Sequence, residues 1–187
     1  MVKFMAASVD YFAQMGFPRE YSIDLTALEK RYIALCQSLH PDRYGDCSSS
    51  FASASEEKAS LVNQAYNVLI DPVERAEHLL HLFSGPAPSE SRTVSADALE
   101  FQLEWRERLA ELGGRGDLGY INSQLVIADA EIVKLISRLE GLFPKNGIEP
   151  DPDWRRDCRE ILNIARFIKT IRASLFTMID RIDFQGA

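Results

Sequence analysis

The chain has 187 residues and carries 28 acidic against 21 basic side chains, which gives a formal net charge of −7 at pH 7. This balance excludes a broadly basic surface, so nucleic acid is not an expected partner. No stretch approaches the roughly 18 unbroken apolar residues of a membrane helix, so we expect no membrane partner either. The three cysteines form no CxxC pair, which favours a reducing, cytoplasmic location over a disulfide framework or a zinc knuckle.

Apolar residues at helical spacing dominate the chain, and no convincing alternating strand is found. A short helix is predicted within 10–18, followed by a longer one over 25–39. Asp24 is placed to cap the longer helix, and Pro41 ends it because proline disfavours helical geometry in the residue before it. The apolar side chains of this helix recur at intervals of three and four residues and share one face: Leu25, Leu28, Tyr32, Leu35 and Leu39.

Two more helices complete the predicted first half. Ser53 and Glu56 have the spacing of a capping box, which predicts that a helix starts at Ser53. A further helix is predicted over 73–83. The stretch that follows, 84–95, begins with a polar, Pro- and Ser-rich sequence and is predicted to be a linker.

Three long amphipathic helices are predicted beyond the linker, over 96–112, 118–143 and about 154–182. Asp151 is the expected cap of the last one, with Pro152 in its first turn. Short connections between long amphipathic helices are typical of antiparallel bundles. We therefore predict an all-α protein with one domain at 1–83 and a three-helix bundle at 96–187.

The tripeptide His40-Pro41-Asp42 ends the helix over 25–39 and allows three interpretations: half of a catalytic site, a pair of metal ligands, or a turn. A catalytic pair needs a third group, an oxyanion site and a pocket. The chain has no GxSxG, Walker-type or glycine-fingerprint motif. Taken alone, the tripeptide is therefore most simply a turn.

The surroundings of the tripeptide favour a more specific interpretation. The sequence DYFAQMGFP (10–18) precedes it, and a Ser-rich loop and NQAYNVLIDP (63–72) follow it. This arrangement resembles a J-domain, in which two antiparallel helices hold a His-Pro-Asp loop at their tip. The resemblance implies docking on a 70-kDa-class heat-shock chaperone, whose ATP hydrolysis is accelerated. The implied contact residues are His40, Pro41, Asp42 and Arg43, with Lys30 and Arg31 on the preceding helix.

A helical bundle follows directly, without a Gly/Phe-rich stretch or cysteine-rich zinc repeats. Together with DPVERAEHLL (71–80), this resembles the HscB family, the J-type co-chaperones of iron–sulfur cluster assembly. The bundle is matched by LEFQLEWRERL (99–109) and ARFIKTI (165–171). The resemblance implies two partners, an HscA-type chaperone and an IscU-type cluster scaffold, and no cofactor. Because only nine residues precede Asp10, a bacterial member is expected.

One face of the helix over 96–112 is acidic. At about 100° per residue, five carboxylates share the face opposite the predicted core: Asp97, Glu100, Glu104, Glu107 and Glu111. The residues alone leave open whether this is a solvated outer face or a surface for a basic, partly apolar partner. The family resemblance implies the second and matches the scaffold-binding positions to Leu99, Leu103, Glu104, Glu107, Glu111 and Phe167.

Other interpretations remain open. Glu74, His78 and His81 have helical spacing that suits a metal, although a plain helix surface explains them as well. A J-protein that recruits a different client through the acidic face is the rival function. An enzyme is the third interpretation, and it is disfavoured because no acid, base and pocket assemble in the sequence.

Overall fold

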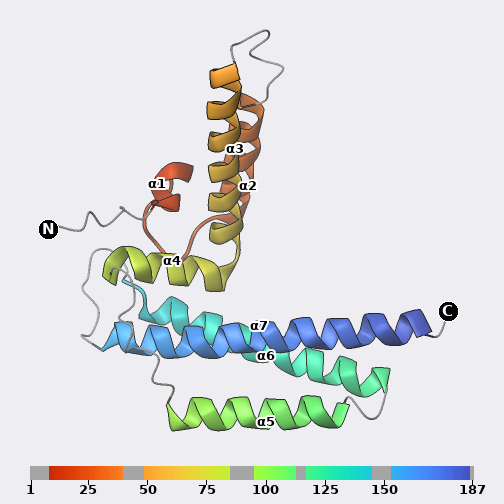
Figure 1. The fold of residues 1–187 in the computed structure, drawn as a ribbon. Coiled ribbons are helices and arrows are strands. Elements are labelled where there is room, and N and C mark those ends of the chain that lie inside the picture. The colour runs from red at the N-terminus through yellow and green to blue at the C-terminus, as the bar shows by residue number, and fades with distance from the viewer. Residues whose placement is uncertain (1–8, 40–48, 85–94, 113–116, 145–152, 186–187) are drawn as a thin grey trace, which may run out of the picture. The chain divides into compact units, whose positions relative to one another are not determined.

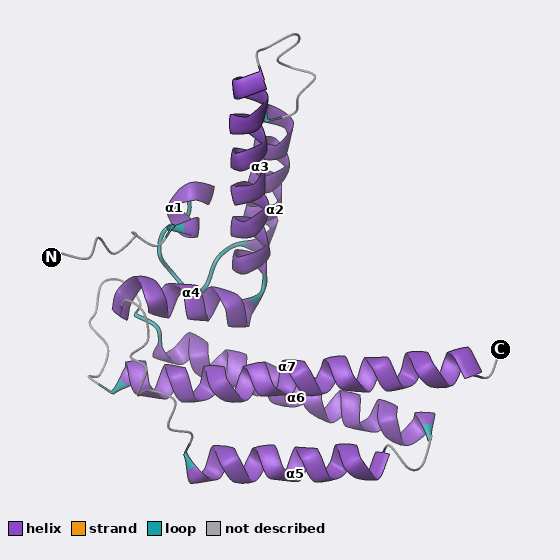
Figure 2. Cartoon of the chain, in the orientation of Figure 1, coloured by secondary structure: helices purple, strands orange, loops and turns teal. Residues whose placement is uncertain are grey.

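The computed structural model describes residues 9–39, 49–84, 95–112, 117–144 and 153–185. Every regular element in these ranges is an α-helix, and no strand occurs in them (Figure 2). The prediction of an all-α protein is confirmed. The chain divides into two compact units, residues 1–85 and 86–187, which we name the N-terminal unit and the C-terminal unit.

The N-terminal unit is built on a helical hairpin. Its helices are α1 (Tyr11–Met15), α2 (Leu25–Ser38), α3 (Ser49–Ile70) and α4 (Pro72–Ser84). In Figure 1, α2 and α3 run side by side in opposite directions, and the short α1 packs against them. The end of α2 and the start of α3 therefore lie at the same end of the hairpin.

Local sequence fixes the ends of α1 and α2. The Asp10 side chain caps α1, and Asp24 Oδ1 accepts hydrogen bonds from Thr26 N at 2.9 Å and Ala27 N at 3.1 Å. Gly16 closes α1 with φ = 76°, a left-handed conformation that glycine adopts without steric cost. The predicted cap at Asp24 and the predicted short helix within 10–18 are confirmed.

The core of the N-terminal unit joins α1 to the hairpin. Phe12 of α1, Leu28 of α2 and Leu69 of α3 are fully buried. Leu25, predicted to share the inner face of α2, is 47% exposed. At about 100° per residue Leu25 lies about 60° away from Leu28, so it stands at the margin of the buried stripe.

The start of α3 differs from the prediction. The helix begins at Ser49, four residues before the predicted cap at Ser53. Serine is only a modestly poorer helix former than alanine, so the serine-containing run ahead of Ser53 joins the helix. The predicted capping box is therefore wrong, because Ser53 lies inside the helix.

A buried arginine fixes the corner between α3 and α4. Asp71 Oδ1 caps α4 by accepting a hydrogen bond from Val73 N at 2.9 Å. Arg75 is only 7% exposed, and its guanidinium donates to the Leu69 carbonyl oxygen while lying over the Tyr21 ring, 5.2 Å from the centroid. The end of α3 and the start of α4 are thus tied by a charged group that is hydrogen-bonded and stacked.

The C-terminal unit is a three-helix bundle of α5 (Ala96–Leu112), α6 (Leu118–Leu142) and α7 (Trp154–Gln185). In Figure 1, α6 and α7 lie side by side and antiparallel, and α5 packs on α7. The predicted bounds of α5 are confirmed, and those of α6 and α7 agree to within three residues. The predicted cap and first-turn proline of the last helix, Asp151 and Pro152, lie outside the described residues.

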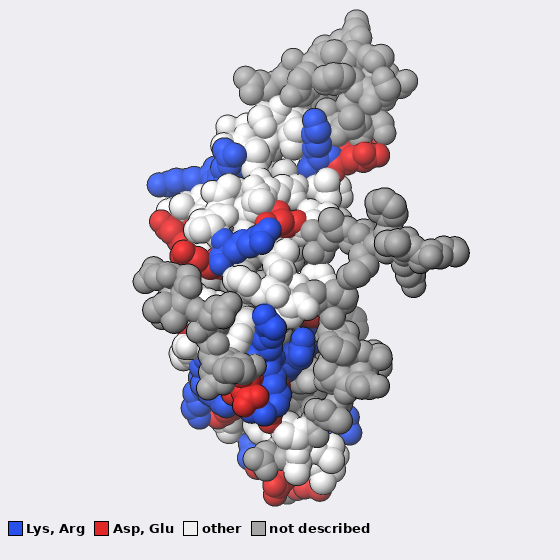
Figure 3. Space-filling model, turned by 90° about the vertical axis from the view of Figure 1, so that its left-hand side faces the viewer, with Lys and Arg blue, Asp and Glu red and all other residues white. Residues whose placement is uncertain are grey.

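Apolar side chains join the three helices of the bundle. The buried ones include Ala98, Trp105, Leu112, Ile121, Leu135, Leu139, Cys158, Ile161, Ile168 and Leu175. Charged side chains lie outside this core, and the face in Figure 3 carries Lys and Arg together with Asp and Glu. Within the ranges that the structure describes, no helix has both the length and the apolar character needed to cross a bilayer.

Candidate partner-binding surfaces

The predicted docking tip follows directly on α2. The backbone amide of Leu39 donates to the Leu35 carbonyl at 3.1 Å, and the Ser38 hydroxyl donates to the same carbonyl at 2.7 Å. These bonds hold the end of α2 in place up to the residue before the tripeptide. The predicted contact residues His40, Pro41, Asp42 and Arg43 lie outside the described residues.

The two basic residues predicted on α2 are both exposed. Neither Lys30 nor Arg31 forms an ion pair with a carboxylate of the described ranges. The Arg31 guanidinium lies close to the end of α1, since a Cβ added at Gly16 would stand 3.9 Å from it. Both cations are therefore available on the outer surface of the hairpin.

A polar and aromatic bridge fixes the two helices of the hairpin. The rings of Tyr32 and Tyr66 stack with centroids 4.1 Å apart and planes 19° apart. The Tyr32 hydroxyl donates to Asn63 Oδ1 at 2.9 Å. Such an aromatic pair contributes about 0.5–1.5 kcal/mol beyond its area burial, so it helps to hold α2 against α3.

On α5, the structure separates an exposed face from a buried one. Leu99 and Leu103 are 59% and 56% exposed, whereas Trp105 is 2% exposed on the bundle side. Four of the predicted acidic residues are exposed next to these leucines: Glu100, Glu104, Glu107 and Glu111. The side chain of Asp97 lies outside the described residues. Two large leucines beside a row of carboxylates form an exposed surface that is both apolar and acidic.

Sequence reasoning missed a basic residue that neutralises part of this face. Arg108 donates to the Glu104 carboxylate one turn earlier, and its guanidinium lies over the Trp105 ring, 5.3 Å from the centroid. The i, i+4 spacing of Glu104 and Arg108 was the signal for this pair. One carboxylate of the acidic face is thus already paired inside the helix.

Phe167 of α7 is half-buried and connects to α5 through aromatic contacts. Its ring meets the Phe101 ring edge-on, with centroids 6.5 Å apart and planes 71° apart. Phe101 in turn lies 6.4 Å from the Trp105 ring. The structure therefore brings the predicted Phe167 next to α5.

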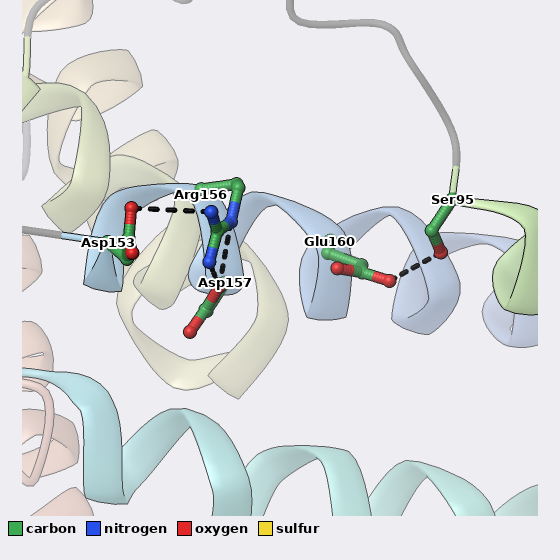
Figure 4. A network of polar contacts seen from close by, with 5 residues as sticks. All are labelled: Ser95, Asp153, Arg156, Asp157 and Glu160. Carbon is green, nitrogen blue, oxygen red and sulfur yellow. Dashed lines mark hydrogen bonds and ion pairs between the residues drawn. The ribbon is translucent and has the colours of Figure 1, made fainter.

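One hydrogen bond joins the start of α5 to α7, and ion pairs lie within the first turn of α7. Figure 4 shows the Ser95 hydroxyl, just before α5, donating to Glu160, and Arg156 pairing with Asp153 at 3.3 Å and Asp157 at 3.2 Å. Asp157 and Glu160 also border a cleft of about 710 Å³, lined by Ala98, Phe101, Glu131, Leu135, Arg138, Gly141, Leu142, Asp157, Glu160, Ile161 and Ile164. Leu135 and Ile161 are almost completely buried, so the bottom of the cleft belongs to the bundle core.

The alternative metal site on α4 does not assemble. His78 Nε2 accepts a hydrogen bond from Tyr11 N at 3.1 Å, so the lone pair that a metal would need is occupied. Over the described ranges, no group of three or more His, Cys, Asp or Glu side chains is arranged to hold a metal ion. Cys158 is fully buried in the bundle core, and burial raises the pKa of its thiol to about 12.

Comparisons with known proteins agree with this two-part architecture. A family model described as the DnaJ domain matches residues 10–78, which run from the cap of α1 into α4. A co-chaperone HscB homolog of Ralstonia nicotianae is 32% identical over 179 residues, which cover 95% of this chain and 98% of that protein. The homolog of Mannheimia succiniciproducens is 31% identical over 92% of this chain and 94% of its own length. The chain belongs to the HscB family.

Solved HscB structures share the whole fold. HscB from Vibrio cholerae superposes with a TM-score of 0.76 at 22% identity, covering 93% of this chain and 99% of that one. The crystal structure of human HscB gives a TM-score of 0.73 at 24% identity, and the match covers 97% of this chain and 84% of the human one. HscB proteins are J-domain co-chaperones of iron–sulfur cluster assembly, and this chain acts in that role.

Proposed function

We propose that this HscB-family protein stimulates ATP hydrolysis by a 70-kDa-class chaperone of the HscA type and delivers an IscU-type cluster scaffold to it. The observation that carries the proposal is that one chain combines a J-domain with an exposed, acidic and leucine-bearing helix in a separate unit. The protein then acts as a cytoplasmic adaptor whose residues change the catalytic cycle of its partner and perform no chemistry themselves.

The J-domain contributes the chaperone contact in this proposal. His40, Pro41 and Asp42 form the docking tip, where Pro41 fixes the turn and the Asp42 carboxylate pairs with an arginine of the chaperone. Lys30 and Arg31 add positive charge along α2, and both are exposed without a described ion-pair partner. Arg43 extends this positive charge past the tip.

The bundle contributes the scaffold contact. The scaffold-binding surface consists of Leu99, Leu103, Glu104, Glu107, Glu111 and Phe167. Complete burial of a leucine side chain contributes roughly 1.5–3 kcal/mol, so covering two half-exposed leucines contributes roughly 2 kcal/mol in all. The carboxylates then select a basic partner and speed its approach.

In this proposal, successive parts of the chain have separate functions. Residues 1–83 act on the chaperone, residues 84–95 link the two parts, and residues 96–187 hold the scaffold. The change of compact unit near residue 85 supports this division.

A titration of purified scaffold into the full-length protein tests the scaffold assignment. We expect micromolar or tighter binding that the double variant Glu104→Lys/Glu107→Lys weakens at least tenfold, with an unchanged melting temperature. The variant Arg155→Glu/Arg159→Glu, on α7, is the charge-reversal control and should bind normally. Wild-type affinity in the Glu104→Lys/Glu107→Lys variant would remove the acidic face from the site and favour a J-protein that presents a different client.

A further inference from the structure

Helix α1 is too short to be stable by itself, and a histidine from α4 completes its first turn. The helix has five residues, whereas isolated helices shorter than about 12–15 residues are marginal in water. The backbone amide of Tyr11, the first residue of α1, has no acceptor within its own helix. It donates instead to His78 Nε2, 67 residues away in the chain, at 3.1 Å.

The imidazole of His78 also packs against both aromatic rings of α1. The ring of Tyr11 lies 4.6 Å from the imidazole, and the ring of Phe12 stacks on it at 5.9 Å with planes 12° apart. Phe12 is fully buried and Met15 is 1% exposed. The contact therefore holds in place the helix whose two buried side chains cover the hairpin core.

This hydrogen bond requires a neutral imidazole. Nε2 can accept from Tyr11 N only when the ring proton resides on Nδ1. In the imidazolium both nitrogens carry hydrogen, so an N–H of His78 would face the N–H of Tyr11. Protonation thus replaces an attractive contact by a repulsive one at the start of α1.

The groups around His78 favour the neutral form overall. Partial burial lowers the pKa of His78. Asp10 opposes that shift, and electrostatic interaction with His81 and Arg19 adds to it. Asp10 is itself engaged by Arg19 at 2.8 Å, which limits its help to an imidazolium. The Tyr11 hydroxyl donates to Gln64 Oε1 at 3.5 Å, and this amide carries no charge.

We propose that His78 is a pH-sensitive clasp, which holds α1 on α4 while the imidazole is neutral and releases the start of α1 when the imidazole is protonated. A histidine whose pKa is lower in the folded protein stabilises the fold fully above its unfolded value near 6.5. That stabilisation is lost as the pH falls from about 6.5 through the folded pKa. Acidification therefore loosens α1 before it unfolds the hairpin.

NMR on the full-length protein tests the clasp directly. The His78 ring signals, assigned with His40→Gln and His81→Gln variants, should titrate below pH 6.5. The protection factor of the Tyr11 amide, corrected for intrinsic exchange, should fall at least tenfold between pH 7.5 and pH 5. In a His78→Gln variant, whose amide oxygen accepts a hydrogen bond and does not titrate, that protection should be independent of pH.

Two results would overturn the proposal. One is a His78 titration at or above pH 6.5 in the folded protein. The other is unchanged Tyr11 protection at pH 7.5 in His78→Phe, which keeps an aromatic ring but has no acceptor. His81→Gln serves as the matched control on the same helix and should retain the pH dependence of the wild type. None of these readouts depends on the chaperone or the scaffold.

Discussion

The ring of Phe167 on α7 meets the ring of Phe101 on α5 edge-on at 6.5 Å, and this contact joins the helix that carries the acidic face to the longest helix of the bundle. Phe167 therefore has two roles in our account. It contacts Phe101 and so joins α7 to α5, and its exposed part belongs to the proposed scaffold-binding surface.

Replacing Phe167 should affect binding more than folding. Phe167→Ala removes an aromatic pair contributing about 0.5–1.5 kcal/mol beyond area burial, so we expect a modest loss of stability. Scaffold affinity, measured by calorimetric titration, should fall about tenfold because the surface loses its aromatic anchor. Phe184→Ala, on the same helix and 88% exposed, is the control and should change neither quantity. Wild-type affinity in Phe167→Ala would exclude Phe167 from the site.

Releasing Glu104 from its intrahelical partner should strengthen scaffold binding. Arg108→Gln frees the Glu104 carboxylate, so attraction to a basic partner should increase by about two- to fivefold, within the range of exposed ion pairs. Arg106→Gln removes the same charge from α5 without breaking a described ion pair. We expect Arg108→Gln to bind more tightly than Arg106→Gln at low salt, with the difference shrinking at high salt. Equal affinities would show that the Glu104–Arg108 pair does not compete with the scaffold.

Removing the buried arginine should destabilise the N-terminal unit alone. Arg75→Ala deletes a charged hydrogen bond to Leu69, worth about 1.5–3 kcal/mol, and a stacked contact with Tyr21. Urea unfolding should show an N-terminal transition destabilised by roughly 2–4 kcal/mol and an unchanged C-terminal one. Arg155→Ala removes a guanidinium from the exposed surface over Trp154 and should cost less than about 1 kcal/mol. Similar losses in both variants would contradict the role assigned to burial.

The helices were predictable wherever capping residues and apolar periodicity agreed. The bounds of α5 follow from the sequence because its apolar periodicity runs to Leu112 and the glycine-rich sequence GGRG (113–116) follows directly. The cap at Asp24 follows from side-chain chemistry alone. The start of α3 was predicted wrongly at Ser53, because serine is compatible with both a cap and a helix interior. The exposure of Leu25 was not predictable, since position within a stripe does not tell how far the partner helix reaches.

The candidate sites also differ in how far the sequence predicts them, depending on whether their residues lie on one helix or on several. The acidic and leucine-bearing face of α5 could be predicted from helical geometry, because all of its residues lie on one helix. The contact of Phe167 with Phe101 and the bond from Tyr11 to His78 join residues more than 60 positions apart, and no local pattern encodes them. The Glu104–Arg108 pair was within reach of local spacing rules and was overlooked. The assignments of His40, Pro41, Asp42 and Arg43 remain predictions.

The most direct test of the central claim is the ATPase rate of the paired HscA-type chaperone, measured with this protein in the presence and absence of scaffold. The wild type should raise the rate, and scaffold should raise it further. His40→Gln should abolish both increases with unchanged circular dichroism and melting temperature, whereas Glu104→Lys/Glu107→Lys should lose only the scaffold-dependent increase. Full stimulation by His40→Gln, or a preserved scaffold-dependent increase in the double variant, would contradict the account.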